Sequence, residues 1–253
     1  MSPKVRTRLF FIFGLGFLAL FLWALRDLPP SGSQIGSYAQ TLDTISVPER
    51  HITDVVTAVN FDFRGFDTMG EEYILFTSVM GILLLLRKQR DEAVGEPREK
   101  APERKVLSSS DAVRVVALGL TAPCLLFGIY TITHGQVSPG GGFQGGVILA
   151  TALLFVFLAG DYEMFSRINA YQKVEIAEAF GAAGYILIGL AAVILGQPFL
   201  KNVLPLAKSG TILSGGTVPL INLSVGIEVG SGILLLATAF LEETLVLMAK
   251  KRR

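Results

Sequence analysis

One acidic side chain is unusual because it lies inside an otherwise apolar segment. Glu228 is about ten residues into the segment that begins near Val218, so it would lie close to the middle of a bilayer. Ser224 and Ser231 share its helical face, four residues before it and three after it. An ionised carboxylate at that depth costs roughly 3 kcal/mol or more unless it is paired or hydrated. The pattern indicates a protonatable carboxylate beside a hydrated ion path, or a protonated Glu that bonds to another helix as a structural link.

A glycine-rich string, HGQVSPGGGFQGG, runs from His134 to Gly146 between two apolar segments. It lacks the Lys-Ser/Thr of a phosphate-binding loop, and no strand pattern precedes it. The string predicts irregular backbone followed by two small-xxx-small pairs, at which a neighbouring helix can approach closely. His134 could be a proton-relay member or a hydrogen-bonded cap on the helix before it. The residues expected to shape this loop and the helix packing are Pro139, Gly140, Gly141, Gly142, Phe143, Gly145 and Gly146.

Further acidic residues lie near the ends of apolar segments. Glu175 and Glu178 open the segment that begins near Val174, where negative charge complements the helix dipole. Glu178 is one turn deeper, which makes it the candidate for a proton entrance. Glu71 and Glu72 are predicted to be an N-terminal cap and dipole pair.

A second polar string, FDFRGFDT, places Asp62, Arg64 and Asp67 among aromatic residues. Arg64 would hold both acids ionised, which argues against a catalytic carboxylate pair. We therefore expect these three residues to form an ion-paired loop that docks against the membrane or contacts another subunit.

These residues must be positioned by membrane-spanning helices. Hydrophobic residues make up 51% of the 253 residues and charged residues 17%, compared with about 25% charged residues in a soluble domain. Apolar runs of about 20 residues, the length that crosses a bilayer, recur along the chain. The predicted fold class is an all-α integral membrane protein with six transmembrane helices. The segments are residues 9–25, 69–86, 112–133, 143–159, 174–195 and 218–248, of which about 219–240 would span the hydrocarbon.

The distribution of Lys and Arg predicts the orientation of these helices. If both termini are cytoplasmic, most of the 22 Lys and Arg residues lie on the cytoplasmic side. An N-in, C-in topology therefore satisfies every loop. The outer loops then hold only Arg26, Arg50, Arg64, Lys201 and Lys208.

The predicted chain has two membrane pieces and a linker. Residues 1–86 form a two-helix hairpin whose long outer loop covers residues 27–68, and residues 111–253 form a four-helix unit. Residues 87–110 are polar and charged, as in a cytoplasmic linker. A short helix after Pro48 is also predicted in the outer loop, because one apolar face is formed by Ile52, Val55, Val56 and Val59.

The composition excludes several classes of function. A net charge of +1 gives no basic field for nucleic acid. Cys124 is the single cysteine, which rules out an intrachain disulfide and a cysteine-ligated iron–sulfur or zinc site. With His51 and His134 as the two histidines, a haem pair or zinc cluster is not expected either. We therefore expect this chain to have no catalytic residues, no metal site and no cofactor.

Three strings of the sequence resemble known families. HGQVSPGGGFQGG resembles the HxxxPGGGFxGG signature of the MnhB/MrpB family, and PLINLSVGIEVGSGILLL, from Pro219, is similar to the last helix of that family. VNFDFRGFDTMGEEYIL, from Val59, is similar to the C-terminal extension of the large antiporter subunit, which also occurs as a small, E-type subunit of membrane-bound hydrogenases. The chain therefore looks like a fusion of this two-helix piece with an MnhB domain over about residues 110–249.

The resemblance implies a supporting subunit of a complex that exchanges Na⁺ or another monovalent cation for protons. It also implies a multi-pass protein in the plasma membrane of a prokaryotic cell. The partners would be other membrane subunits, the cation, protons and lipid. Glu228, with His134 and Glu178, would line or polarise a hydrated route on which the cation competes with a proton. The proton motive force would drive this exchange.

Two other interpretations stay open. The same two pieces occur in hydrogenase-like or respiratory complexes, in which an ion module is coupled to a redox arm. The chain could also be a purely structural scaffold whose buried charges are paired and inert. An independent six-helix transporter is not expected, because the sequence has no inverted repeat.

Overall fold

The computed structural model describes residues 3–26, 28, 36–86, 110–160, 165 and 170–251, with side chains up to residue 241. Contacts divide the chain into two compact units, Met1–Leu42 and Asp43–Arg253, each of which is described by itself. The predicted linker at 87–110 lies outside the described residues except for Ser110. The domain boundaries expected from the sequence therefore stay a prediction.

The first unit consists of one long apolar helix and the beginning of a second. α1 covers Pro3–Arg26, and α2 covers Ser37–Arg50 and continues into the second unit. The large apolar side chains of α1 are exposed along its whole length, with Phe10 and Phe13 among them. A helix that is apolar on every side suits the interior of a bilayer rather than an aqueous surface.

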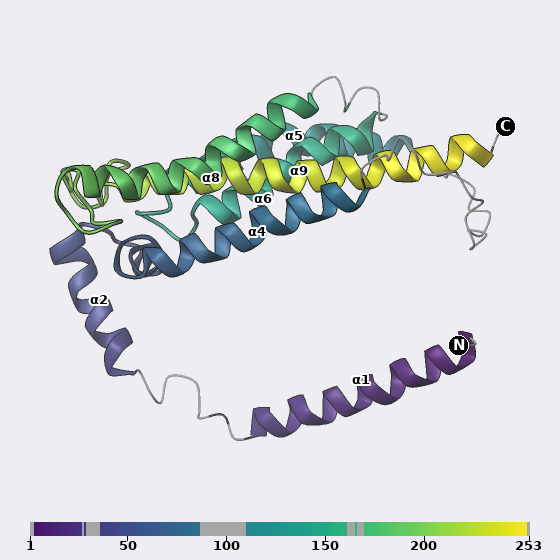
Figure 1. Ribbon diagram of the computed structural model, residues 1–253, viewed down its shortest axis with the longest axis horizontal. Coiled ribbons are helices and arrows are strands. Elements are labelled where there is room, and N and C mark those ends of the chain that lie inside the picture. The colour runs from purple at the N-terminus through teal and green to yellow at the C-terminus, as the bar shows by residue number, and fades with distance from the viewer. Residues whose placement is uncertain are drawn as a thin grey trace. The chain divides into compact units, whose positions relative to one another are not determined.

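The second unit is built from five long helices, and α9 runs along the middle of them, between α8 and α4 (Figure 1). In the apolar span of α9, 61% of the residues are buried, compared with 11% in the span of α4. α9 is therefore the central helix: α4, α6 and α8 pack against it, whereas α5 packs mainly against α6. The five helices are α4 (Gly65–Leu86), α5 (Asp111–Thr133), α6 (Gly142–Ala159), α8 (Tyr171–Ile194) and α9 (Val218–Lys251).

Among the described residues, six helices are long and apolar enough to cross a membrane. They are α1 and the five long helices of the second unit, which confirms the predicted all-helical fold with six candidate spans. Their bounds lie within a few residues of the predicted segments. The N-in, C-in orientation stays a prediction.

The start of α4 differs from the sequence-based expectation. The helix begins at Gly65, four residues before the predicted Met69. Glu71 and Glu72 therefore lie in its second turn, and the prediction that they cap its N-terminus was wrong. Glu72 is buried, whereas Glu71 is exposed. The two neighbouring acids thus lie on different sides of α4, and only Glu72 is inside the protein.

The segment before α4 also differs from the expected helix. α2 continues through Pro48, and the chain then forms α3 (Val55–Ala58) and a π-helix, η1 (Val59–Phe63). The predicted apolar face is buried only in part, because Ile52 is 0% exposed whereas Val56 is 63% exposed. The main core, which contains Tyr185, Ile221 and Val225, also includes three side chains of this segment: Ile52, Ala58 and Phe61. The segment is therefore held against α8 and α9 rather than lying free on a surface.

Candidate functional site

Three glutamates from three different helices are buried in the second unit. Glu72 on α4 is 2% exposed, and Glu178 on α8 and Glu228 on α9 are each 1% exposed. Both carboxylate oxygens of Glu178 and Glu228, and Oε2 of Glu72, are buried without a hydrogen-bond partner. A buried polar group in that state costs free energy, so a protein keeps it only for a reason.

Glycines on α8 and α9 allow the two helices to approach closely beside these acids. A Cβ atom at Gly181 would lie 2.5 Å from the backbone nitrogen of Glu228, and one at Gly184 would clash with Oγ of Ser224. A Cβ atom at Gly232 would lie 3.3 Å from Oε1 of Glu178. These contacts fix an antiparallel register in which Glu178 is next to Gly232, one turn along α9 from Glu228.

The third acid comes from the other side of α9. The same Cβ position at Gly232 would lie 3.3 Å from Cγ2 of Val79 on α4. α4 and α9 both start at the same end of the bundle and therefore run in the same direction. Seven residues before the contact of Val79 with Gly232, Glu72 on α4 and Val225 on α9 therefore lie at nearly the same height along the bundle. That height is about one helical turn before Glu228. The order along the bundle is Glu72, Glu228, Glu178, with levels roughly 5 Å apart.

Electrostatic contacts join these acids into a longer series. Glu228 interacts with both Glu72 and Glu178. Glu72 also interacts with Glu71, and Glu178 with Glu175. Glu71 and Glu175 are exposed. We call these five residues the carboxylate row, which is accessible at both ends and enclosed in the middle.

Two tyrosines hold α4 against α8 beside the row. The hydroxyl of Tyr73 donates to the carbonyl of Ala182 at 3.1 Å. The hydroxyl of Tyr185, a fully buried side chain, donates to the carbonyl of Gly65 at 2.8 Å. These bonds fix α4 in the position that brings Glu72 to α9.

The glycine-rich string seats the start of α6 on α9. The N–H of Gly142 donates to Oδ1 of Asn222 at 2.9 Å. A Cβ atom at Gly142 would clash with the carbonyl of Asn222, and one at Gly146 would lie 2.8 Å from the carbonyl of Gly226. Gly141 has φ of 135°, which favours glycine at the start of the helix. Phe143, by contrast, is 46% exposed.

The other three residues of the motif lie in the loop or against α5. A Cβ atom at Gly140 would lie 3.0 Å from Cγ2 of Thr131, and one at Gly145 would clash with the side chain of Ile132. Pro139 precedes these glycines in the loop that leads to α6. The close approach that the string predicts is therefore made to both α5 and α9.

His134 lies beside the glycine-rich loop rather than on the carboxylate row. Its ring stacks on that of Tyr130, with centroids 4.0 Å apart. Nδ1 is 3.1 Å from both the hydroxyl of Thr133 and the carbonyl of Tyr130. The loop meets α9 at Asn222, six residues or about 9 Å before Glu228. These contacts match the capping alternative for His134.

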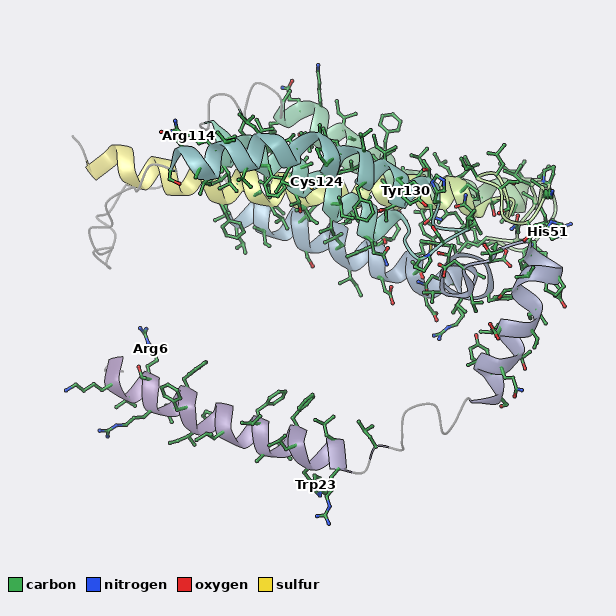
Figure 2. The ribbon with its side chains drawn as sticks, turned by 180° about the vertical axis from the view of Figure 1, so that it is seen from behind. Arg6, Trp23, His51, Arg114, Cys124 and Tyr130 are labelled. Atoms are coloured by element: carbon green, nitrogen blue, oxygen red, sulfur yellow. The ribbon has the colours of Figure 1, made fainter. Side chains whose placement is uncertain are left out.

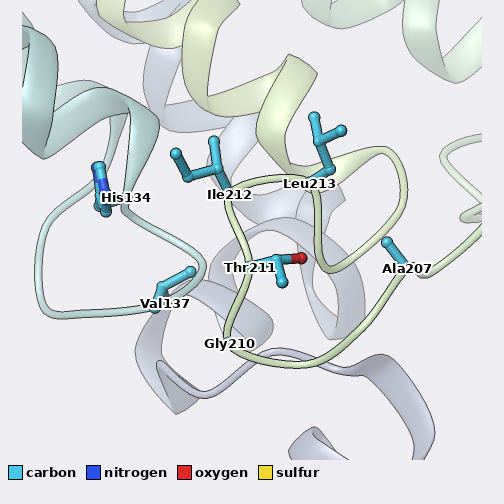
Figure 3. Close-up of a pocket in the computed structure, with 7 residues that line it drawn as sticks. All are labelled: His134, Val137, Ala207, Gly210, Thr211, Ile212 and Leu213. Atoms are coloured by element: carbon cyan, nitrogen blue, oxygen red, sulfur yellow. The ribbon is translucent and has the colours of Figure 1, made fainter.

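The same loop borders a cavity of about 530 Å³ between the connecting segments (Figure 3). The cavity is lined by His134, Val137, Ala207, Gly210, Thr211, Ile212 and Leu213.

In Figure 2, Tyr130 lies at the end of α5 near these segments, and Arg114 lies at the opposite end with Cys124 between them. We call the end of the bundle near Tyr130 the loop end.

The structure separates the three charged residues of the FDFRGFDT string. Asp62 forms its ion pair with Arg50 and accepts a hydrogen bond from Nδ2 of Asn202 at 3.1 Å. Arg64 pairs with Asp67, and both side chains are about half exposed. The expectation that Arg64 pairs with both acids was wrong for Asp62, which pairs with Arg50. A contact of this loop, through Asp62, Arg64 and Asp67, with another subunit stays a prediction.

Sequence reasoning missed Glu72. The signal available was its spacing, since Gly65, Thr68, Glu72 and Val79 form one buried face of α4. This face can be recognised in the sequence only if the helix is taken to begin at Gly65. Two of the predicted acids, Glu178 and Glu228, are brought together with Glu72, and Ser224 and Ser231 lie on the same face of α9 as Glu228.

The fold and the row define a class of protein: a multi-pass helical membrane protein with a line of acids enclosed among its candidate spans. Among the described residues, no group of three or more His, Cys, Asp or Glu side chains could hold a metal ion.

Comparison with known proteins defines the family. Residues 112–235 match the model of a domain related to the MnhB subunit of the Na⁺/H⁺ antiporter, and residues 8–101 match the MbhE model, which describes the E-type subunit of MBH. The B-type subunit of the Na⁺/H⁺ antiporter of Alkalihalophilus pseudofirmus is 31% identical over 99 residues, which are 39% of this chain and 68% of that protein. The chain belongs to the MnhB family of antiporter subunits and carries an N-terminal MbhE domain.

Two solved complexes contain similar chains. A chain of the membrane-bound sulfane sulfur reductase, an archaeal respiratory membrane complex, is 28% identical with a TM-score of 0.68, and the match covers 94% of this chain and 98% of that one. A chain of the Mrp complex from Dietzia sp. DQ12-45-1b has the same TM-score at 21% identity, and the match covers 94% of this chain but 26% of that one. The second likeness shows the fold.

Proposed function

We propose that this chain is a membrane subunit of a multisubunit monovalent cation (Na⁺)/proton antiporter, in which the carboxylate row supports or lines the ion route. The observation that carries the proposal is the row itself: three buried glutamates with unpartnered oxygens, between two exposed ones. Acids inside a membrane span are costly and mark ion or proton pathways. The name of the A. pseudofirmus relative supports Na⁺ as the cation.

The predicted N-in, C-in orientation gives the row a direction. The loop end then faces outward, with Glu71 as the outer member of the row. Glu175, at the start of α8, is the inner member, and the proton motive force favours protonation from outside and release inside. The proposed location of the chain is the plasma membrane of a prokaryotic cell, as a multi-pass subunit.

Movement along the row needs a bridge between levels. Neighbouring levels are roughly 5 Å apart, which exceeds the length of a hydrogen bond. A water molecule or a side-chain rotation must therefore connect Glu72 to Glu228 and Glu228 to Glu178. Repulsion between neighbouring carboxylates opposes ionisation of both at once, so protonation of one member depends on the state of the next.

The test uses the native complex in everted vesicles, with a pH-sensitive dye to follow cation-driven proton exchange. Glu228→Gln keeps the shape of the side chain and removes its charge, and we expect it to lower the exchange rate at least tenfold. Glu49→Gln is the matched control because Glu49 is exposed on α2. Unchanged exchange in Glu228→Gln, with normal assembly, would assign the row to structure and the chain to a scaffold role.

A redox-coupled complex is the second candidate function. It is favoured by one observation, since the match to the sulfane sulfur reductase chain covers 98% of that chain with both segments present. The row would then serve the ion module of a respiratory complex. Iron measured in the purified complex, together with the identities of its subunits, separates this candidate from the antiporter.

A further inference from the structure

We infer that the loop end holds a buried site for ordered water, formed by the side chains of Gln136, Ser214 and Asn222. The inference does not rest on the proposed function. All three side chains are 0% exposed. Each has one buried polar atom to which no group in the described part of the chain bonds: Oε1 of Gln136, Oγ of Ser214 and Nδ2 of Asn222. A buried polar atom of this kind usually has a partner, which can be an ordered water molecule.

Hydrogen bonds fix the orientation of both amide side chains. Nε2 of Gln136 donates to two carbonyls, one of which belongs to Ile212, so the side-chain oxygen of Gln136 remains as a free acceptor. Oδ1 of Asn222 accepts the N–H of Gly142 at 2.9 Å, so its amide nitrogen remains as a free donor. The hydroxyl of Ser214 can donate and accept. The three free atoms are therefore one acceptor, one donor and one group that can do either.

Contacts of the glycine-rich loop bring these side chains into one region. A Cβ atom at Gly135, the residue before Gln136, would lie 3.0 Å from Nδ2 of Asn222. The bond from Gln136 to Ile212 joins the same loop to the segment that carries Ser214, two residues further on. The loop therefore touches both the first turns of α9 and the connection between α8 and α9.

A short segment before α3 encloses the region from another side. The carbonyl of Gln136 accepts the N–H groups of residues 53–54, at 3.1 and 3.4 Å. A Cβ atom at Gly215, the residue after Ser214, would lie 2.8 Å from Cγ1 of Ile52, which is 0% exposed. This segment thus reaches from Gln136 to the neighbour of Ser214.

The loop-end cavity gives water a route to the region. The cavity of about 530 Å³ is lined by Val137 and Leu213, which are the chain neighbours of Gln136 and Ser214 (Figure 3). Leu213 is 72% exposed, so this part of the lining is open to solvent. Water therefore comes within one residue of two of the three side chains.

The free atoms fit water better than an ion. A cation would meet the N–H group of Asn222, and an anion would meet the oxygen of Gln136. Water donates and accepts, and a buried water molecule makes about three hydrogen bonds to groups that otherwise lack partners. Ordered water at this site would join the glycine-rich loop, the α8–α9 connection and α9.

The first test is the sign of a change in stability, measured on the native complex by SDS titration with proteolysis of the unfolded chain. Ser214→Ala removes the hydroxyl. If that hydroxyl binds water, its removal should lower the folding equilibrium constant about fivefold; if it has no partner, its removal should raise the constant. Ser209→Ala is the matched control, because Ser209 is a half-buried serine of the same connection.

The second test is a cryo-EM map of the wild-type native complex at a resolution that shows water, which does not depend on the variant folding. We expect a density peak within hydrogen-bond distance of at least two of the three free atoms, and Ser214→Ala less stable than Ser209→Ala. Equal or higher stability of Ser214→Ala would overturn the inference, and so would a map without the peak. The titration is repeated with NaCl in place of choline chloride. If NaCl stabilises the wild type but not Ser214→Ala, the site binds a cation and the assignment to water is wrong.

Discussion

Replacing Gly181 by alanine should force α8 and α9 apart at the middle of the carboxylate row. The new Cβ atom would lie 2.5 Å from the backbone nitrogen of Glu228 and 2.7 Å from its Cα and Cβ. Ordinary contacts between such atoms are about 3.5–4.0 Å, so the helices must separate by roughly 1 Å. The clash is with main-chain atoms, and no side-chain rotation can relieve it.

The expected cost follows from this geometry. Overpacking a well-packed interface costs about 1–3 kcal/mol. Alanine also raises helix propensity by up to about 1 kcal/mol, which would hide part of the loss. Gly81→Ala on α4 is the matched control, because nothing lies within 4 Å of its Cβ position. The difference in unfolding free energy between the two variants therefore isolates the overpacking. This difference corresponds to about a fivefold to hundredfold change in the unfolding equilibrium constant.

The assay is an SDS titration of the native complex. Limited proteolysis measures how much of the tagged chain is unfolded at each SDS fraction. Gly181→Ala should unfold at a lower SDS fraction than Gly81→Ala, and proton exchange in vesicles should fall because the distance from Glu228 to Glu178 changes. Equal resistance of the two variants would refute the close approach at Gly181. The antiparallel register and the order of the row would then be wrong.

Three further predictions concern single positions. Glu72→Gln should lower proton exchange about as much as Glu228→Gln in the vesicle assay, and more than Glu71→Gln; the reverse order would remove Glu72 from the row. Asn222→Ala should lower stability by about 1–3 kcal/mol in the SDS titration, because the buried N–H of Gly142 loses its acceptor; an unchanged midpoint would show that this bond does not seat α6. His134→Ala should leave the pH dependence of exchange unchanged, as expected of a helix cap, and a shifted profile would restore it as a relay member.

Much of the fold could be predicted because the signals are local. The bilayer sets the length of each apolar segment, so the six candidate spans follow from hydrophobic runs alone, and their ends agree to within a few residues. Glu228 and Glu178 were identified for the same reason, since a charge within an apolar run is visible in sequence. Glu72 was missed because its burial depends on where α4 begins and on which helix lies opposite. The pairing of α4 with α9 is a long-range contact that no local pattern specifies.

The segment from His51 to Phe63 shows a second limit of local reasoning. Its apolar spacing predicted one helical face formed by Ile52, Val55, Val56 and Val59. Ile52 does enter the core, but Val56 is exposed, and Phe61, which is not on that face, is buried instead. Contacts with Tyr185 and Ile221 determine which residues of this segment are buried. The backbone forms a π-helix at Val59–Phe63, which contains the buried Phe61. Of the three hydrophobic residues of this segment that enter the core, the period of the sequence predicted only Ile52, and tertiary packing determined the other two.

The glycines and the acids of this chain belong to one physical arrangement. Gly181 on α8 lies against Glu228, and Gly232 on α9 lies against Glu178. These glycines let α8 and α9 pack closely, and this contact excludes lipid from both acids. Because Glu72 comes from the MbhE segment, the row has all three of its buried members only when that segment is docked. A fused chain fixes the docking, so covalent linkage of the two segments keeps all three levels of the row in register.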